Sequence, residues 1–202
     1  MNARIFRGDT RLDAVPVDDR GLAYGDGLFE TLRVHRGEVP WWNDHWSRLC
    51  HGAARLGLPL PDAARVRDEA KSLFADGGDG VLNARHPGIV QDRGGVLQLL
   101  VTRGAGERGY APPANPVPTW IVSRHAVPAM PKRGLNLHLC EFRIASQPTL
   151  AGIKHCNRLE QVLARAEAER AGADEGLVLD STGTAVGATA ATLFALVDGR
   201  WV

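Results

Sequence analysis

Cysteine, lysine and long apolar runs are all scarce in this sequence of 202 residues. Its three cysteines are widely spaced and form no Cys-x-x-Cys pair, which argues against a disulfide framework and a zinc knuckle. The densest apolar stretch, Val96 to Val101, is interrupted by Gln98 and is far shorter than the roughly 20 residues of a membrane-spanning helix. The N-terminus turns polar at once, without the apolar stretch of a signal peptide. We therefore expect a cytoplasmic protein with reduced thiols and no membrane partner.

A large excess of charge of either sign is also missing. The 24 basic and 23 acidic side chains leave a net charge of +1, so no overall field attracts nucleic acid. The seven histidines show no spacing typical of metal ligands, and we expect no metal site. Hydrophobic residues make up 44% of the chain and charged residues 23%, which is the usage of a globular protein with one or two domains.

The pattern of apolar residues predicts a mixture of strands and helices, as in the α/β or α+β class. Strands are predicted over residues 28–35, 38–42, 95–102, 119–125, 135–144, 177–180 and 193–197, the first two joined as a hairpin. Helices are predicted from Asn43 or Asp44 to Gly57, over residues 61–74, and over residues 158–171 after an Asn157 cap paired with Glu160. Asp198-Gly199 has the composition of a hairpin turn.

Proline and glycine mark the predicted boundaries. Four prolines fall in the eight residues 111–118, so we expect a linker over residues 112–118. It would separate an N-terminal domain over residues 1–111 from a C-terminal domain over residues 119–202. The glycine-rich, polar residues 76–95 predict a long exposed loop.

Chemistry that requires a deprotonatable amine has only three candidate lysines here. Lys154 is flanked by apolar residues just before a predicted helix, and both surroundings lower the pKa of an amine, as a Schiff-base lysine requires. Lys71 and Lys132 have the sequence contexts of solvated residues. A lone lysine before a helix is more often a surface residue, so the residues alone leave both interpretations of Lys154 open.

Three arginines have similar alternatives. The segment RGAGERG at residues 103–109 matches neither a Walker A loop nor the glycine pattern of a Rossmann fold. It is either a solvated turn or a loop whose Arg103 and Arg108 bind carboxylates. Arg48, beside Leu49 on a predicted helix, either extends to solvent or binds an anion.

Four stretches together resemble the fold-type IV pyridoxal-phosphate enzymes, also called class IV aminotransferases. They are DRGLAYGDGLFET at residues 19–31, HWSRL at residues 45–49, IKHCNRLEQV at residues 153–162 and ADEGLVLD at residues 173–180. The resemblance covers nearly the whole chain apart from residues 77–94, which look like an insertion. It implies a two-domain fold, a homodimer and the cofactor pyridoxal 5'-phosphate (PLP).

The resemblance also implies roles for individual residues. Lys154 would carry PLP, Arg48 would bind its phosphate, and Thr192 would stand at a cofactor-binding position usually held by asparagine. Within the family, TRGAGERGY at residues 102–110 is most similar to the aminodeoxychorismate lyases, which form 4-aminobenzoate and pyruvate for folate synthesis. Arg108, with Arg103, would then meet a substrate carboxylate in a site completed by a second subunit. The alternatives are an aminotransferase for D- or branched-chain amino acids and a truncated, catalytically impaired remnant of the family.

The sequence departs from the family pattern in two places. Gly187 occupies the position of a glutamate whose carboxylate pairs with the pyridine nitrogen of the cofactor. We expect this loss to harm transamination more than a lyase step that is helped by aromatisation. The second departure is length, because family members continue well beyond the hairpin at Asp198-Gly199, which predicts an incomplete C-terminal domain.

Overall fold

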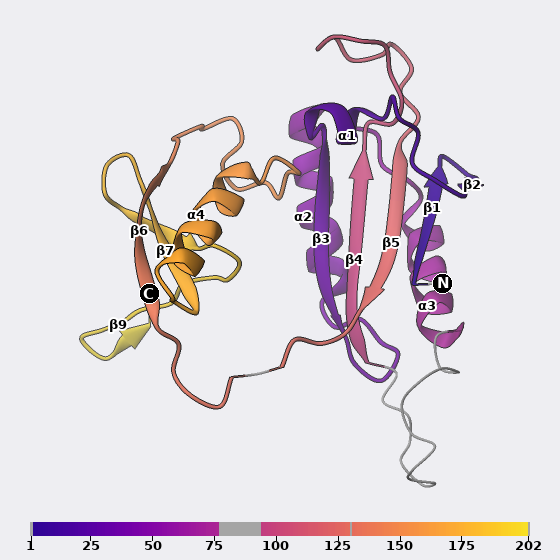
Figure 1. Cartoon of the computed structure of the whole chain (residues 1–202). Coiled ribbons are helices and arrows are strands. Elements are labelled where there is room, and N and C mark those ends of the chain that lie inside the picture. The colour runs from indigo at the N-terminus through magenta and orange to yellow at the C-terminus, as the bar shows by residue number, and fades with distance from the viewer. Residues whose placement is uncertain (1, 77–93, 130, 202) are drawn as a thin grey trace, which may run out of the picture. The chain divides into compact units, whose positions relative to one another are not determined.

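The computed structural model describes residues 2–76, 94–129 and 131–201, which form two compact units (Figure 1). The first unit contains residues up to 128 together with residues 152–156. The second contains residues 129–151 and 157–202. The chain therefore leaves the first unit, returns to it briefly around Lys154, and leaves it again.

The first unit is built on one antiparallel sheet. Its strands are β1 (Ala3–Arg7), β2 (Thr10–Leu12), β3 (Gly27–Val34), β4 (Gly95–Thr102) and β5 (Thr119–His125). Their order in space is β2-β1-β5-β4-β3, so β3 is an edge strand of this sheet. A short helix, α1 (Arg20–Tyr24), precedes β3.

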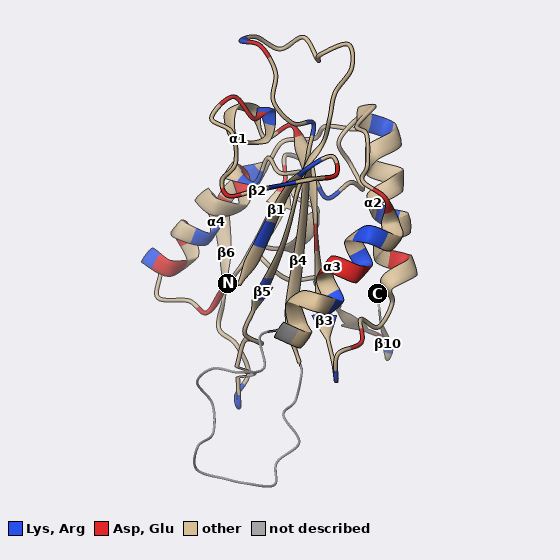
Figure 2. Ribbon diagram, turned by 90° about the vertical axis from the view of Figure 1, so that its right-hand side faces the viewer, with Lys and Arg blue, Asp and Glu red and all other residues tan. Residues whose placement is uncertain are grey.

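Two helices cover one face of this sheet. They are α2 (Trp42–Leu56), which contacts β3, and α3 (Ala63–Asp76), which contacts β5 and β1. Figure 2 shows both on the same side of the strands. Strand side chains alternate, and the buried set on this side includes Leu32, Leu97, Leu99 and Val122. Each such side chain contributes roughly 1.5–3 kcal/mol on burial.

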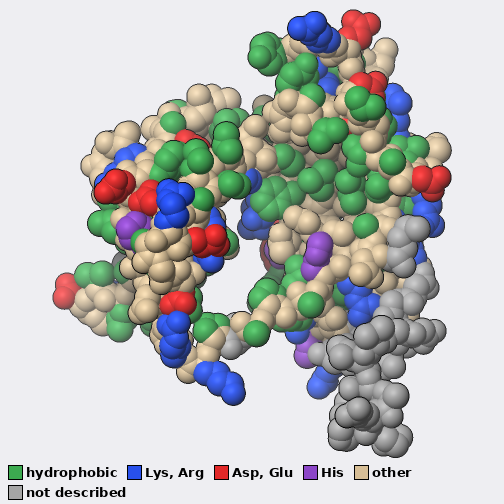
Figure 3. All heavy atoms as spheres, viewed as in Figure 1, with side chains coloured by type: hydrophobic (Ala, Val, Ile, Leu, Met, Phe, Trp, Pro, Cys, Tyr) green, Lys and Arg blue, Asp and Glu red, His purple; other side chains and the backbone are tan. Residues whose placement is uncertain are grey.

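The opposite face of the sheet is here called the open face. It carries the strand side chains that point away from α2 and α3. Phe29, Leu100 and Ile121 lie side by side on it, through the β3–β4 and β4–β5 registers, and are partly buried. Figure 3 views the first unit from this side and shows hydrophobic side chains gathered over the strands.

The second unit contains a three-stranded sheet and one helix. Strands β6 (Leu137–Ile144) and β7 (Glu175–Asp180) are parallel, and β8 (Ala185–Ala188) is antiparallel to β7. Helix α4 (Leu159–Arg170) provides the crossover that a parallel pair requires. It packs on β6 and β7 around a small core of Cys140, Ala164 and Val178. A separate hairpin of β9 (Leu196–Val197) and β10 (Arg200–Trp201) turns at Asp198-Gly199, as predicted.

The structure corrects the predicted domain boundary. Residues 112–118 join β4 to β5, and both strands belong to the first sheet, so this proline-rich segment is a connection within the first unit. Trp120 on β5 is fully buried there and stacks on Phe6 of β1. The boundary lies after residue 128 instead. Most of the predicted loop over residues 76–95 lies outside the described residues.

Two local predictions are also wrong. The expected strand over residues 38–42 is reduced to one bridge between His35 and Glu38, because Trp42 begins α2 and is buried in the first turn of that helix. Helix α4 is not capped by Asn157. Arg158 is its N-cap residue, and the Glu160 carboxylate accepts a hydrogen bond from the Ala145 N–H at 3.0 Å instead.

Candidate active site

Lys154 lies against the outer edge of β3. The Phe29 N–H donates to the Lys154 carbonyl at 3.0 Å, and the Cys156 N–H donates to the Gly27 carbonyl at 2.9 Å. Between these bonds, Leu28 and His155 form an antiparallel bridge. The segment around Lys154 therefore extends the first sheet by one short pairing, which fixes its backbone.

The amine of Lys154 lies beside an aromatic ring. Its Nζ is 4.4 Å from the centroid of the Phe29 ring, within the range of a cation–π interaction when the amine is protonated. Phe29 belongs to the open face, opposite the side of β3 that packs on α2. The pairing with β3 thus places the one lysine singled out by the sequence on the sheet face that neither α2 nor α3 covers.

Gly52 on α2 allows the helix to approach this segment closely. A Cβ atom there would lie 3.1 Å from Leu28 Cδ1 and 3.5 Å from the Cβ of Ile153, the residue before Lys154. Leu28 and Ile153 are both buried. Arg48 lies one helical turn before Gly52 on α2, so the lysine segment and Arg48 share the same neighbourhood of β3.

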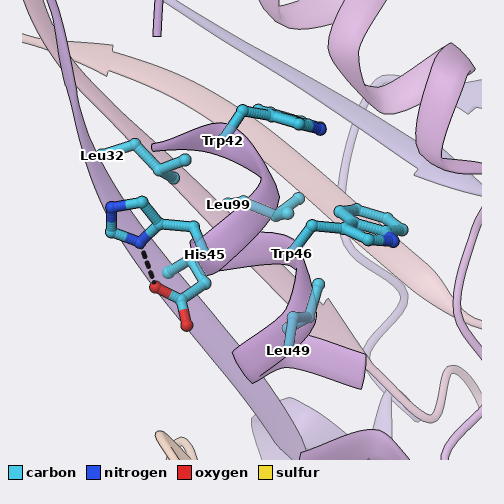
Figure 4. A pocket seen from close by; sticks show the side chains of 7 residues that line it. Leu32, Trp42, His45, Trp46, Leu49 and Leu99 are labelled. Atoms are coloured by element: carbon cyan, nitrogen blue, oxygen red, sulfur yellow. Dashed lines mark hydrogen bonds and ion pairs between the residues drawn. The ribbon is translucent and has the colours of Figure 1, made fainter. Parts of the chain in front are cut away.

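Arg48 is held by a buried carboxylate. Its Nε donates to Glu30 Oε1 at 2.7 Å, and its Nη2 donates to Glu30 Oε2 at 2.5 Å. The His45 ring nitrogen Nδ1 lies 2.8 Å from the same Oε2 (Figure 4). Glu30 is 1% exposed, whereas the Arg48 side chain is 48% exposed. The hydrogen bonds from Arg48 to Glu30 raise the pKa of Arg48 further, so this cation stays charged.

The two bonds to Glu30 leave one edge of the Arg48 guanidinium available. They use Nε and Nη2, and Nη1 has no hydrogen-bond partner among the residues that the structure describes. A half-exposed cation with a free N–H edge is suited to an anion such as phosphate. The crevice behind it, lined by Glu30, Leu32, Trp42, His45, Trp46, Leu49 and Leu99, has space for about one water molecule. It is a packing gap and cannot hold a cofactor.

Arg103 has a different environment from the one expected. Its guanidinium is buried, with Nε and Nη2 donating to the Asp26 carboxylate at 2.7 and 3.0 Å. Nη1 and Nη2 also donate to the carbonyls of Gly57 and Leu56. Four of its five N–H groups are thereby occupied, so the geometry argues against a substrate contact. Arg103 instead ties the end of α2 to Asp26.

Asp26 is correspondingly stabilised in its charged form. Burial alone would raise its pKa, but hydrogen bonds from Arg103 and Arg20 outweigh burial and lower the pKa below its usual value. Arg108, five residues after Arg103, is exposed and makes no hydrogen bond or ion pair within the described ranges. Of the two arginines, Arg108 is therefore the one that can meet a carboxylate from outside.

The remaining predicted positions lie in the second unit. Thr192 is exposed in the segment before β9. Gly187 lies on β8 with a φ of +151°, and a Cβ there would meet only the Ala191 carbonyl, at 3.8 Å. Lys154 and Arg48 share the first unit, held by the consecutive residues Phe29 and Glu30.

Sequence reasoning missed Glu30, Phe29 and Asp26 as supporting residues. The signal for Glu30 was present, because its place on β3 puts an acid among Leu28 and Leu32 on the core side. A buried acid of this kind requires a cation and hydrogen-bond partners. Arg48 supplies the cation, and the ring of His45, three positions earlier on α2, is a further partner. Asp26 gives a weaker signal, because one of its partners, Arg103, is 77 positions away in the sequence.

The donor set fits the aldehyde and the phosphate of PLP. Lys154 supplies an amine for an aldehyde, and Arg48 supplies a fixed cation for a phosphate. Gly187 supplies no carboxylate for a pyridine nitrogen. Within the described residues no group of three His, Cys, Asp or Glu side chains could hold a metal ion, and none of the described helices could span a membrane.

The sequence profile of the amino-transferase class IV family matches residues 27–202. The chain belongs to this family. An aminodeoxychorismate lyase from Vibrio harveyi is 33% identical over 190 residues, which cover 92% of this chain and 65% of that protein. This class IV chain therefore spans about two thirds of the length of that relative.

Solved structures of class IV enzymes are also similar to this chain. The 4-amino-4-deoxychorismate lyase of Pseudomonas aeruginosa is 44% identical, with a TM-score of 0.80 over 98% of this chain and 68% of that chain. A branched-chain amino acid aminotransferase from T.th., solved with N-(5'-phosphopyridoxyl)-L-glutamate, is 22% identical with a TM-score of 0.79 over 99% of this chain and 66% of that chain. The second likeness shows the shared fold, and enzymes of this class IV family depend on PLP.

Proposed function

We propose that this protein is a PLP-dependent lyase that converts 4-amino-4-deoxychorismate to 4-aminobenzoate and pyruvate. The observation that carries the proposal is the 44% identity to the Pseudomonas aeruginosa lyase over nearly the whole chain. The docking of Lys154 beside Phe29 supports it, because it presents the required amine at a fixed place. We further propose that the enzyme acts in the cytoplasm as a homodimer, with the exposed Arg108 contributing to the substrate site.

In the proposed enzyme Lys154 would hold PLP through Nζ, and Arg48 would bind the phosphate through its Nη1 edge. Thr192 is a further proposed cofactor contact, supported by its position in the family pattern. When bound, PLP withdraws electrons from the substrate carbon that loses a proton. The Lys154 amine is the base that takes this proton. The bond between the ring carbon and the side-chain oxygen breaks, and the side chain leaves as enolpyruvate, which gains the proton and becomes pyruvate. The ring that remains is aromatic, which favours the reaction.

Gly187 favours the lyase over an aminotransferase. An aminotransferase must store a full carbanion in its cofactor, and this relies on a carboxylate beside the pyridine nitrogen. The lyase step gains aromaticity and so depends less on that support. The second candidate, an aminotransferase for D- or branched-chain amino acids, is a competing hypothesis that product detection decides.

The test uses purified protein with added PLP. We expect a visible absorbance band, and reduction with borohydride should attach the cofactor mass to the peptide that contains Lys154. Lys154→Ala should lose both signals, while Lys71→Ala, an exposed lysine on α3, should keep them. Protein that stays colourless with excess PLP would overturn the proposal and support a catalytically impaired family remnant.

Product detection separates the two enzyme candidates. Pyruvate released from 4-amino-4-deoxychorismate, followed with a coupled dehydrogenase, should appear together with 4-aminobenzoate. Amino-group transfer from D-alanine or a branched-chain amino acid should be slower by a wide margin. The opposite order of the two rates would identify an aminotransferase.

A further inference from the structure

Arg20, the first residue of α1, binds three consecutive carbonyls of the loop that carries Arg108. Its Nη1 donates to the carbonyls of Gly109 and Ala111 at 3.0 and 3.2 Å, and its Nη2 donates to that of Tyr110 at 3.0 Å. Its Nε donates to Asp26 at 2.9 Å. The Arg20 side chain is 5% exposed, so this network is shielded from water.

Asp18 and Tyr24, which lie close to Arg20 in the sequence, also hold the loop, on either side of Arg108. The Gly109 N–H donates to the Tyr24 hydroxyl at 2.9 Å, and the Gly106 N–H donates to the Asp18 carbonyl at 3.1 Å. Gly106 packs against Arg20 so closely that a Cβ would lie 2.9 Å from its Cδ. The backbone is therefore fixed on both sides of Arg108.

The side chains of Arg108 and Tyr110 contribute little to this order. Arg108 is exposed and Tyr110 is 86% exposed, with only an edge contact to the Tyr24 ring at 5.5 Å between centroids. Because the loop buries few apolar atoms, its conformation depends on hydrogen bonds to its backbone. Arg20 supplies three of them from one rigid guanidinium, which the single ammonium of a lysine cannot reproduce.

We infer that Arg20 is a positioning residue for the substrate carboxylate, acting by fixing the backbone beside Arg108. The inference rests on the proposed function and extends it, because it gives the N-terminal stretch around residues 19–24 a role in substrate binding. Arg20 touches neither Lys154 nor Arg48 in any contact that the structure describes. Cofactor binding and substrate binding should therefore respond differently to its loss.

The test measures binding of 4-aminobenzoate to the PLP-loaded protein by calorimetry. Arg20→Lys should raise the dissociation constant of 4-aminobenzoate roughly tenfold, through a mobile Arg108 that no longer presents its charge at one place. Arg108→Ala should have a similar effect. The double variant should be no weaker than the single Arg108→Ala variant, because Arg20 acts through Arg108.

Two further readouts separate positioning from general damage. The Gly109 amide should exchange its hydrogen faster in Arg20→Lys, while PLP loading at Lys154 stays as in the wild type. Arg33→Lys is the matched control, since Arg33 also donates to two carbonyls, those of Val34 and Gly95, but touches no residue of the loop. Tyr24→Phe removes the bond to the Gly109 N–H and provides a second variant if Arg20→Lys does not fold.

Additive effects of Arg20→Lys and Arg108→Ala, or unchanged 4-aminobenzoate binding in a variant whose Gly109 amide exchanges faster, would overturn the inference. A wild-type protein that does not bind 4-aminobenzoate would overturn it as well. Failure of the proposed lyase function looks different, because the wild type would then bind 4-aminobenzoate and load PLP without releasing pyruvate.

Discussion

Glu30 accepts hydrogen bonds from two nitrogens of the Arg48 guanidinium, at 2.7 and 2.5 Å, while being almost fully buried itself. The pair is asymmetric, because the acid lies inside the first unit and half of the Arg48 side chain remains exposed. A buried acid thus determines which edge of a surface cation faces solvent. The proposed phosphate contact of Arg48 depends on that orientation.

Replacing Glu30 with glutamine should weaken binding of PLP. The amide keeps the shape of the side chain but loses the charge and one of the two acceptors facing Arg48. We expect the dissociation constant of PLP to rise roughly tenfold and the free energy of unfolding to fall by about 1–3 kcal/mol. Titration with pyridoxal, which lacks the phosphate, should show no such weakening, and Glu38→Gln, away from Arg48, should change neither value.

The pH dependence of stability should reflect Asp26. Its pKa is lower in the folded protein than in the unfolded chain, so its contribution is fully present above the unfolded pKa of about 3.9. That contribution is lost as the pH falls through the lower, folded pKa. Asp26→Asn should therefore destabilise the protein near neutral pH and make its stability less sensitive to acid.

Urea unfolding between about pH 2 and pH 5 measures this effect, because the contribution of Asp26 is lost below the unfolded pKa. Asp68→Asn, which changes an exposed carboxylate on α3, serves as the control. Equal loss of stability on acidification in wild type and Asp26→Asn would contradict the assigned role of Asp26 between Arg20 and Arg103.

Gly52→Ala should be destabilising although alanine is the better helix former. The helix would gain about 1 kcal/mol from the substitution. The new methyl group would lie 3.1 Å from buried Leu28 Cδ1, and overpacking of this kind costs about 1–3 kcal/mol. We expect a lower melting temperature together with weaker attachment of PLP at Lys154, since Ile153 is displaced. Gly134→Ala adds a methyl group in open space and should leave both unchanged.

Gly187→Glu should shift the balance between the two proposed reactions. A carboxylate near the pyridine nitrogen should raise the rate of amino-group transfer more than the rate of pyruvate release. The positive φ of Gly187 makes any side chain strained there, so some stability should be lost. Gly187→Ala carries the same backbone strain without the carboxylate. No gain in either activity over Gly187→Ala would count against the assigned role of this position.

The sequence correctly predicted strands that are rich in apolar residues. Residues 95–102 and 119–125 are strands with the predicted bounds, because their apolar side chains are buried in the sheet. The strand predicted over residues 38–42 failed because tryptophan favours strands on average, whereas Trp42 is buried as the first residue of a helix. Propensity cannot report which neighbour a side chain will pack against.

The candidate site was predictable only in part for a related reason. The resemblance singled out Lys154 and Arg48, and both lie against β3. Arg103 was expected, with Arg108, to meet a substrate carboxylate. The geometry argues against that contact, because Arg103 is bound by Asp26 and by carbonyls at the end of α2, none of them near it in sequence. An arginine in a loop carries no local sign of whether its partner is internal or a ligand.

The pairing between Phe29 and Lys154 joins β3 to a segment far away in the sequence and has a consequence for synthesis of the chain on the ribosome. Strand β3 is made early, but the edge next to Gly27 and Phe29 finds its partner only after residue 156 has left the ribosome. Until then a row of backbone donors and acceptors stays open to pairing with other chains. We expect the docking of the lysine segment to limit such pairing, so variants that loosen it should lower the yield of soluble protein.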